Sequence, residues 1–178
     1  MTRILVAYGS TEGQTATIAD RMGDVLAAEG HDVTLVHLNH PPAGLEPGSY
    51  DGVIVGGSIH MGSHQQYVTD FVHDQQTTLN RLPSAFFSVS LSSASADPEA
   101  RSAAEGLLEE FLEETGWDPD GTLAVAGALK YSEYGLLKRF VMRRIARKSG
   151  GDTDVSRDHE YTDWDAVEAF AAEFATLL

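Results

Sequence analysis

The fold is decided near the start of the chain, by the stretch Ile4-Leu5-Val6-Ala7-Tyr8-Gly9-Ser10-Thr11-Glu12-Gly13-Gln14-Thr15. An apolar run typical of a buried strand passes into a short loop of hydroxyl residues, and helical periodicity follows at once. Such a unit aims backbone N–H groups and the positive end of a helix dipole at one point, where a phosphate can bind. The stretch therefore predicts a phosphate-binding loop; the alternative is an ordinary strand-to-helix turn with good capping.

The loop residues suit a monophosphate better than a triphosphate. Ser10, Thr11 and Thr15 supply hydroxyl donors, and Gly13 lets the backbone approach an anion closely. The loop holds no Lys or Arg and lacks the pattern G-x-x-x-x-G-K-[ST], which argues against a P-loop nucleotide hydrolase. We therefore expect neutral donors to hold the phosphate.

Length and composition limit the kind of protein. The 178 residues predict one domain, residues 1–178, with a substantial core. The chain contains no cysteine, which excludes disulfides, thiolate metal sites and cysteine nucleophiles. Neither a secretory signal nor an apolar run of membrane-spanning length is visible in the sequence, so we expect a soluble cytoplasmic protein.

The chain is strongly acidic, with a formal net charge of -15 from 27 acidic and 12 basic residues. This charge disfavours nucleic acid as a partner. Only Lys130, Lys138 and Lys148 are lysines. An acid-rich, lysine-poor surface suits a high-salt cytoplasm, where screening acts over about 3 Å at molar salt. An ordinary acidic protein fits the composition equally well.

Strand-like runs alternate with helical periodicity, which predicts an α/β fold: a doubly wound parallel sheet with helices on both faces. Five strands are expected, at Arg3–Tyr8, Asp32–Leu38, Gly52–Gly57, Ala85–Leu91 and Leu123–Leu129. A long insertion follows the fifth strand and contains the crossover segment Tyr134–Ser149. The last helix is expected to have Thr162 as its N-cap, with Asp165 three residues on.

Ligands of such sheets bind beyond the carboxyl ends of the strands, where the strand order reverses. The third strand leads into the glycine-rich stretch 56–64, whose backbone can pass close to a flat ligand. Small polar residues at 91–95 follow the fourth strand, and their backbone groups can bond the edge of a heterocycle. Each loop alone also fits a generic turn. His60 and His64 invite a metal interpretation, but no carboxylate lies nearby, so we expect no metal site.

The three loops together resemble the flavodoxin family, whose ligand is FMN. The opening stretch matches the family signature at Val6, Tyr8, Ser10, Gly13, Thr15 and Ala19, and departs from it at Ala7, where a bulkier apolar residue is usual. The resemblance assigns the FMN phosphate to Ser10, Thr11, Glu12, Gly13, Gln14 and Thr15. It assigns the isoalloxazine ring to Ser58, Ile59, His60, Met61, Gly62, Leu91, Ser92 and Ser93. Many flavodoxins stack an aromatic side chain on the ring, whereas residues 59–61 offer only an imidazole.

A basic island, Lys130–Lys148, interrupts the acidic chain after the fifth predicted strand. Its basic residues are Lys130, Lys138, Arg139, Arg143, Arg144, Arg147 and Lys148, and its one acid is Glu133. An anionic substrate, an anionic membrane surface, an acidic partner and a plain solvated helix face are alternative explanations. At 100° per residue, Leu137 and Arg144 lie on the same side of the predicted helix. The apolar residues therefore gather at its start and the basic residues at its end, and not on opposite faces as in a helix that lies on a membrane. This pattern favours an anionic ligand, or a peripheral and mostly apolar docking.

Further blocks narrow the resemblance. Residues 86–91, 127–131, 149–154 and 161–164 are similar to the menaquinone-dependent protoporphyrinogen dehydrogenase family, and the similarity spans nearly the whole chain. Members of that family are flavodoxin-like FMN enzymes that oxidise protoporphyrinogen IX and pass the electrons to a membrane quinone. The resemblance implies a substrate site at Lys130, Tyr131, Arg139 and Arg143, where the cations would meet the substrate propionates.

The predicted function is FMN-dependent oxidation of protoporphyrinogen IX, or of a related anionic tetrapyrrole, in haem biosynthesis, with a quinone as acceptor. No acid–base pair stands out, so the flavin is expected to carry the chemistry and no catalytic side chain is predicted. Two alternatives remain: a flavodoxin-type electron carrier between protein partners, and a non-catalytic FMN-binding module that docks an acidic partner. We expect the protein in the cytoplasm, with peripheral contact to the inner face of the cell membrane through the basic island.

Overall fold

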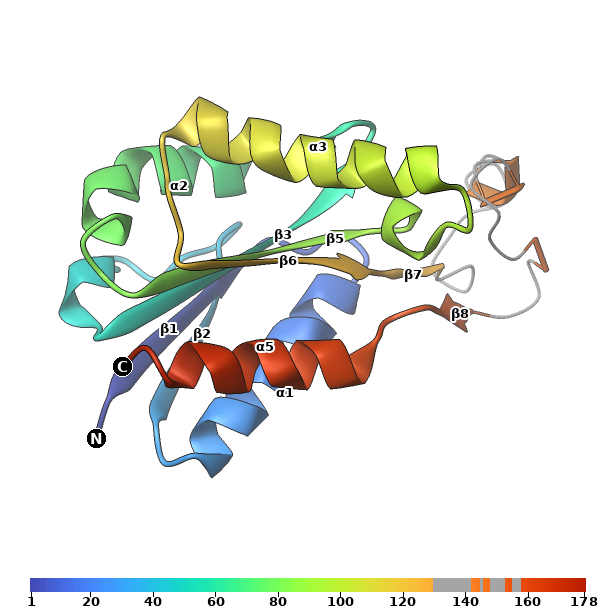
Figure 1. Ribbon diagram of the computed structural model, residues 1–178. Helices are drawn as coiled ribbons and strands as arrows, with labels where there is room; N and C mark the ends of the chain where they lie inside the picture. The colour runs from blue at the N-terminus through green and yellow to red at the C-terminus, as the bar shows by residue number, and fades with distance from the viewer. Residues whose placement is uncertain (130–141, 145, 148–152, 155–157) are drawn as a thin grey trace.

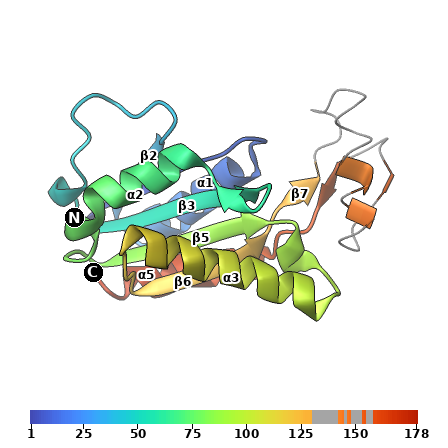
Figure 2. The ribbon, with the colours of Figure 1, turned by 90° about the horizontal axis from the view of Figure 1, so that it is seen from above.

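The computed structural model describes residues 1–129, 142–144, 146–147, 153–154 and 158–178 (Figure 1). The strands of the main sheet are β1 (Arg3–Tyr8), β2 (Asp32–His37), β3 (Gly52–His60), β4 (Ser63–His64), β5 (Ser84–Ser90) and β6 (Gly121–Ala126). The α-helices are α1 (Gln14–Ala28), α2 (Gln66–Leu79), α3 (Pro98–Thr115) and α5 (Trp164–Ala175). Helices α2 and α3 cover one face of the sheet, and α1 and α5 cover the other (Figures 1 and 2).

The sheet has the strand order β2-β1-β3-β5-β6, and these strands are all parallel. The chain starts in the middle of the sheet, builds one edge with β2, and then crosses back over β1 to build the other side. This is the doubly wound arrangement that the sequence predicts. The strand order reverses between β1 and β3, which is the place where sheets of this kind bind ligands.

The sheet has six strands, so the prediction of a five-stranded sheet is wrong. Strand β3 continues through residues 58–60, which the sequence placed in a loop, and the chain turns back as β4 with Ile59 opposite His64. A two-residue hairpin turn of this kind favours positive φ at its central residues, and Met61 (φ 52) and Gly62 (φ 85) both have it. The sequence pattern hid the turn because a methionine rarely adopts that conformation.

The fifth predicted strand is split into two parts. Strand β6 ends at Ala126, and β7 (Ala128–Leu129) forms a separate antiparallel ribbon with β8 (His159–Glu160). The insertion predicted after this strand lies mostly outside the described residues. Within Tyr134–Ser149 the structure describes residues 142–144 and 146–147, which are helical. The β7–β8 ribbon therefore brings residues on either side of the insertion together.

Both faces of the sheet are packed with apolar side chains. Ile4 and Val6 point into the cluster formed with α1 and α5, whereas Leu5 and Ala7 point into the cluster formed with α2 and α3. Successive residues of a strand face opposite sides of a sheet, so a strand buried on both faces reads as an unbroken apolar run. All four side chains are fully buried.

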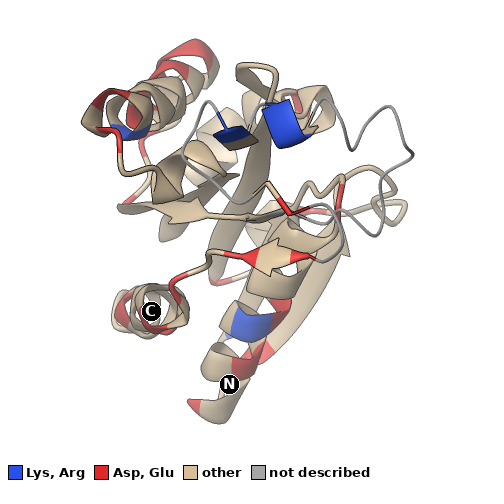
Figure 3. Cartoon of the chain, turned by 90° about the vertical axis from the view of Figure 1, so that its right-hand side faces the viewer, with Lys and Arg blue, Asp and Glu red and all other residues tan. Residues whose placement is uncertain are grey.

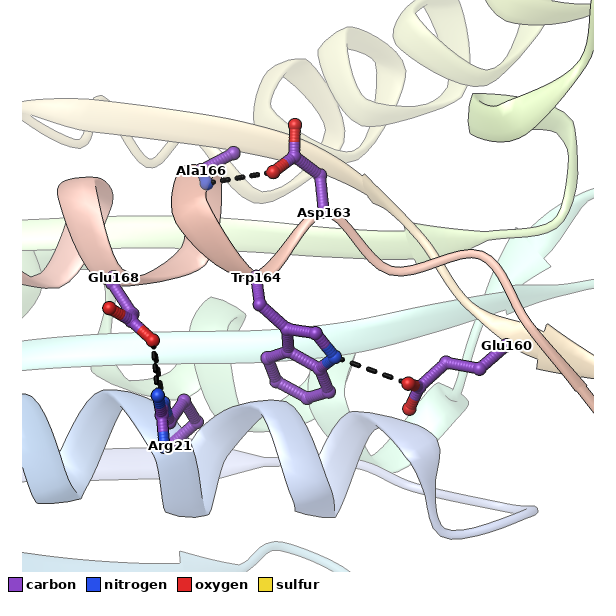
Figure 4. A network of polar contacts seen from close by, with 6 residues as sticks. All are labelled: Arg21, Glu160, Asp163, Trp164, Ala166 and Glu168. Atoms are coloured by element: carbon purple, nitrogen blue, oxygen red, sulfur yellow. Dashed lines mark hydrogen bonds and ion pairs between the residues drawn. The ribbon is translucent and has the colours of Figure 1, made fainter.

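The N-cap of α5 is Asp163, so the prediction of Thr162 as the cap is wrong. The carboxylate of Asp163 accepts a hydrogen bond of 3.1 Å from the backbone N–H of Ala166 (Figure 4). The hydroxyl of Thr162 donates instead to the carbonyl oxygen of Ala126, at 2.8 Å. Thr162 is therefore used to fix the chain beside the end of β6, and the helix begins one residue later than expected.

His64 is buried in the layer between the sheet and α3. Its Nε2 lies 2.8 Å from the hydroxyl oxygen of Ser88, and its ring packs on Phe86 and Phe111 with centroid distances of 5.4 and 4.8 Å. Burial lowers the pKa of His64 to about 4 from its ordinary value of 6.5. The imidazole is therefore neutral in the folded protein at neutral pH.

This burial predicts an acid-sensitive fold. Between about pH 6.5 and pH 4 the unfolded chain binds a proton at His64 that the folded chain excludes, so the free energy of unfolding should fall as pH falls through this window and should be independent of His64 above it. The full loss is on the order of 3 kcal/mol. Urea unfolding at a series of pH values measures this loss in His64→Gln and in the exposed control His73→Gln. Only in His64→Gln should the free energy of unfolding depend less on pH between 6.5 and 4. The same pH dependence in His64→Gln as in the parent protein would contradict the role of His64.

Candidate functional site

A pocket of about 360 Å³ opens at the carboxyl edge of the sheet. It lies at the ends of β1, β3, β5 and β6, the position that the strand order predicts. Its lining residues are Glu12, Gln14, Thr15, Ser58, Ile59, His60, Met61, Gly62, Val89, Ser90, Leu91, Ser92, Leu107, Gly127, Ala128 and Met142. The described lining contains no Lys or Arg, so a bound anion would be held by neutral donors.

Most of the residues that the sequence assigned to the cofactor meet in this pocket. Four of them do not line it: Ser10, Thr11, Gly13 and Ser93. The sequence missed six lining residues, which are Val89, Ser90, Leu107, Gly127, Ala128 and Met142. Leu107 belongs to the apolar stripe of α3, and the sequence pattern there predicts a core residue. The sequence around it therefore does not indicate a binding site. The roles of the predicted residues toward a ligand stay predictions.

The loop between β1 and α1 has the geometry of an anion site. Gly13 occupies the N-cap of α1 with φ 92, a conformation that favours glycine. Its N–H donates to the hydroxyl oxygen of Ser10 at 3.0 Å, and its carbonyl accepts from the backbone N–H and the hydroxyl of Thr17. The first turn of α1 carries no acidic residue, although Glu12, which lines the pocket, directly precedes the N-cap.

Two aromatic residues fix the backbone of Ser10. The N–H of Asn39 donates to Nδ1 of His37 at 3.2 Å, so Nε2 of His37 carries the proton and donates to the carbonyl oxygen of Ser10 at 3.1 Å. The hydroxyl of Tyr67 bonds to the backbone of Ser10, and burial raises the pKa of this phenol. The loop is therefore held in place before any ligand binds.

Gln65, which no sequence motif marks, joins this loop to the hairpin after β3. Its Oε1 accepts from the N–H of Ser58 at 3.0 Å. Its Nε2 donates to the hydroxyl oxygens of Ser58, at 2.5 Å, and Thr11, at 3.3 Å. One side chain thus couples the segments to which the sequence assigned the phosphate and the ring of the cofactor.

Gly56 is required by packing rather than by a ligand. It is buried, and a Cβ atom at this position would lie 2.0 Å from Cζ of Phe87. The sequence suggested that the paired glycines let the chain pass close to a flat ligand. For Gly56 the structure corrects that interpretation, because its missing side chain makes room for a core phenylalanine.

The two histidines of the hairpin point to different partners. Nε2 of His60 lies 3.1 Å from the hydroxyl oxygen of Ser58, whereas His64 bonds to Ser88 in the core. Among the described residues there is no group of three side chains that would hold a metal ion. Likewise, no helix in the described part of the chain is long and apolar enough to cross a membrane.

Of the predicted substrate residues, only Arg143 is described, and it is exposed. Lys130, Tyr131 and Arg139 lie outside the described residues. Arg143 and Arg144 directly follow Met142, which lines the pocket. The three lysines of the chain lie outside the described residues, so the blue segments in the view onto this end of the molecule are all Arg; some lie on helices that also carry Asp and Glu, and others lie beside the grey trace (Figure 3).

Comparison with known proteins identifies the family. The flavodoxin domain model matches residues 5–156. The chain is 36% identical over 178 residues to the protoporphyrinogen IX dehydrogenase (quinone) of Escherichia coli K12, covering 98% of this chain and 96% of that protein. A protein of the same name from Leishmania major is 32% identical, with 98% and 75% covered. The chain belongs to the flavodoxin domain family.

Solved structures agree with this membership at the level of the fold. Oxidised flavodoxin 1 from Bacillus cereus superposes with a TM-score of 0.61 at 21% identity, covering 99% of both chains. Flavodoxin 2 from the same organism gives a TM-score of 0.59 at 23% identity, again with 99% of both chains covered. These structures confirm the predicted fold, and the family match together with the relatives confirms the resemblance inferred from the sequence.

Met61 offers a test of the hairpin at the rim of the pocket. Its side chain is fully exposed and its φ of 52 is unfavourable for a methionine. Met61→Asn should stabilise the chain by about 0.5–1 kcal/mol, because Asn-Gly is the preferred pair in such turns. Gly62 has φ 85, and no atom lies within 4 Å of the Cβ that an alanine would add there. Gly62→Ala should therefore destabilise the chain through backbone strain alone. Thermal unfolding measures both variants, and shifts of the same sign would contradict the turn.

Proposed function

We propose that this chain is an FMN-dependent dehydrogenase that oxidises protoporphyrinogen IX to protoporphyrin IX and passes the electrons to a quinone, a step of haem biosynthesis. The observation that carries the proposal is the 36% identity to the Escherichia coli enzyme of that name, over 98% of this chain. The proposed site of this reaction is the pocket at the carboxyl edge of the sheet, where the strand order reverses.

The residues at the pocket fit FMN. The N–H groups at the start of α1 and the hydroxyl of Thr15, which lines the pocket, would hold the phosphate at the helix N-terminus. Ser10, whose oxygen already accepts from Gly13, keeps its hydroxyl proton for the same phosphate. Residues 58–62 and 91–93 would hold the isoalloxazine ring. FMN, when bound, supplies the redox chemistry, and the protein supplies binding and orientation.

Apolar side chains beside this site suit a tetrapyrrole. Leu91, Leu107 and Met142 all line the pocket and come from three different segments of the chain. A macrocycle packed against them would bring a propionate within reach of Arg143, which follows Met142 and is exposed. Lys130, Tyr131 and Arg139 complete the proposed substrate site.

Electron transfer to a quinone gives the basic island a second proposed role. Quinones of respiratory chains reside in the membrane, and Arg143, Arg144 and Arg147 are exposed in the described part of the island. We place the protein in the cytoplasm, with Lys130–Lys148 in peripheral contact with the inner face of the membrane. An acidic protein partner at the same surface is the competing explanation.

An electron carrier is the second candidate function, because the solved structures of the same fold include flavodoxins. A carrier needs no substrate site beside the flavin. The two candidates differ in redox behaviour, since a carrier predicts two well-separated one-electron steps with a very low second potential. A redox titration of the FMN-loaded protein therefore discriminates between them.

The proposal predicts turnover that needs both FMN and a quinone. The chain reconstituted with FMN is mixed with protoporphyrinogen IX and a short-chain quinone without oxygen, and porphyrin fluorescence is followed. Fluorescence should rise only when both are present. Arg143→Ala should raise KM for the porphyrinogen about fivefold with little change in kcat, because an exposed charged contact is lost. Arg81→Ala, an exposed cation at the end of α2, is the control.

Absence of FMN-dependent porphyrin formation with any quinone would refute the proposed activity. An equal rise in KM for Arg143→Ala and Arg81→Ala would refute the substrate site alone. In that case the effect would come from the overall charge of the protein and not from a local contact.

A further inference from the structure

Gln14 joins two segments that are far apart in the sequence. It is the first residue of α1 and belongs to the proposed phosphate loop, and its side chain is almost fully buried. Its Nε2 donates to Oε1 of Glu160 and to the hydroxyl oxygen of Thr162, both at 2.9 Å. Glu160 is the last residue of β8, and Thr162 lies just before α5. One amide group therefore links the loop to the chain that follows the insertion.

Both partners of Gln14 make a further hydrogen bond to the segments around them. The second carboxylate oxygen of Glu160, Oε2, accepts from the indole N–H of Trp164 at 3.2 Å (Figure 4). Thr162 donates its own proton to Ala126, so its oxygen faces Gln14 as an acceptor. The arrangement needs a group with two N–H donors at position 14 and a group with two acceptor oxygens at position 160.

The segment that Gln14 holds also builds the wall of the pocket. Glu160 lies opposite Ala128 in the β7–β8 ribbon, and the N–H of Tyr161 donates to the carbonyl oxygen of Gly127 at 3.1 Å. Gly127 and Ala128 both line the pocket. The N–H of Gly127 also donates to the carbonyl oxygen of Ser90 at 3.2 Å, so the sheet holds one side of this wall. The contact between Gln14 and Glu160 connects the β7–β8 side of the wall to the phosphate loop.

Packing of the helices does not depend on Gln14. An ion pair between Arg21 of α1 and Glu168 of α5 joins the two helices directly (Figure 4). Their apolar faces also meet in one buried cluster that contains Ile18 and Val167. Removal of the Gln14 amide should thus leave the layer of α1 and α5 intact, and its effect should be confined to the site.

We propose that Gln14 is a positioning residue that couples the phosphate loop to the β7–β8 ribbon, so that FMN binding and ordering of the ribbon stabilise each other. The inference rests on the proposed binding of FMN. A ligand phosphate that fixes the N-terminus of α1 also fixes the Gln14 side chain, and with it Glu160. Coupling of this kind is reciprocal: loosening of the ribbon must weaken FMN binding by the same factor.

The test is Gln14→Met, which keeps the length of the side chain and removes its donors. The control is Gln66→Met, because Gln66 makes the same kind of bond, 2.9 Å to Asp70, on the exposed face of α2. In the FMN-loaded chain, hydrogen exchange at the Tyr161 amide should be about fivefold faster in Gln14→Met only, and the Kd for FMN should rise about fivefold, the equivalent of one hydrogen bond.

A second variant keeps the proposal falsifiable if Gln14→Met fails to fold. Gln14 and Trp164 donate to different oxygens of Glu160, and Glu160→Gln replaces one of these oxygens by an NH2 group that cannot accept. One of the two bonds is therefore lost, and the exchange rate at Tyr161 should rise by a smaller factor. Unchanged exchange at Tyr161 in Gln14→Met would overturn the coupling, and so would unchanged exchange in Glu160→Gln if Gln14→Met does not fold. If exchange and FMN affinity change as expected while the parent protein turns over no porphyrinogen, the coupling stands and the proposed activity fails.

Discussion

Burial of the sheet on both faces is the constraint from which the rest of the molecule follows. Side chains of β1 alternate between two apolar clusters, so helices must cover both sides. Polar chemistry is thereby confined to the ends of the strands. At the carboxyl edge the strand order reverses between β1 and β3, and the loops that diverge there leave the pocket between them.

Local sequence predicts the parts of the fold that depend on local rules. The bounds of β1 agree residue for residue with the apolar run at Arg3–Tyr8, and the glycine at the start of α1 lies where the phosphate-loop pattern placed it. The missed strand β4 comes from turn chemistry. Met61 in a positive-φ conformation gives no signal of a hairpin, so the end of β3 and all of β4 were assigned to a loop.

The site is predictable as a set of loops but not as a network of contacts. The pattern of hydroxyls and glycines points to the three segments that meet at the pocket. It does not predict that Gln65 ties two of them together, because a single glutamine belongs to no motif. Gln14 was assigned to the phosphate, yet its amide bonds to Glu160, which lies 146 positions later in the chain. Such partners become visible only when the fold brings them together.

The acidity of the chain explains why these hydrogen bonds between distant segments matter. A protein with a formal charge of -15 repels a phosphate at long range, although salt limits that repulsion to about 8 Å at physiological ionic strength. Attraction at the site must then come from short-range donors, since the described lining offers no cation. Neutral donors bind an anion well only when they already point at it, because reorienting them costs entropy. In the proposed FMN site, the bonds that His37, Gln65 and Gln14 make around the loop would supply that preorganisation, in place of the positive charge that the loop lacks.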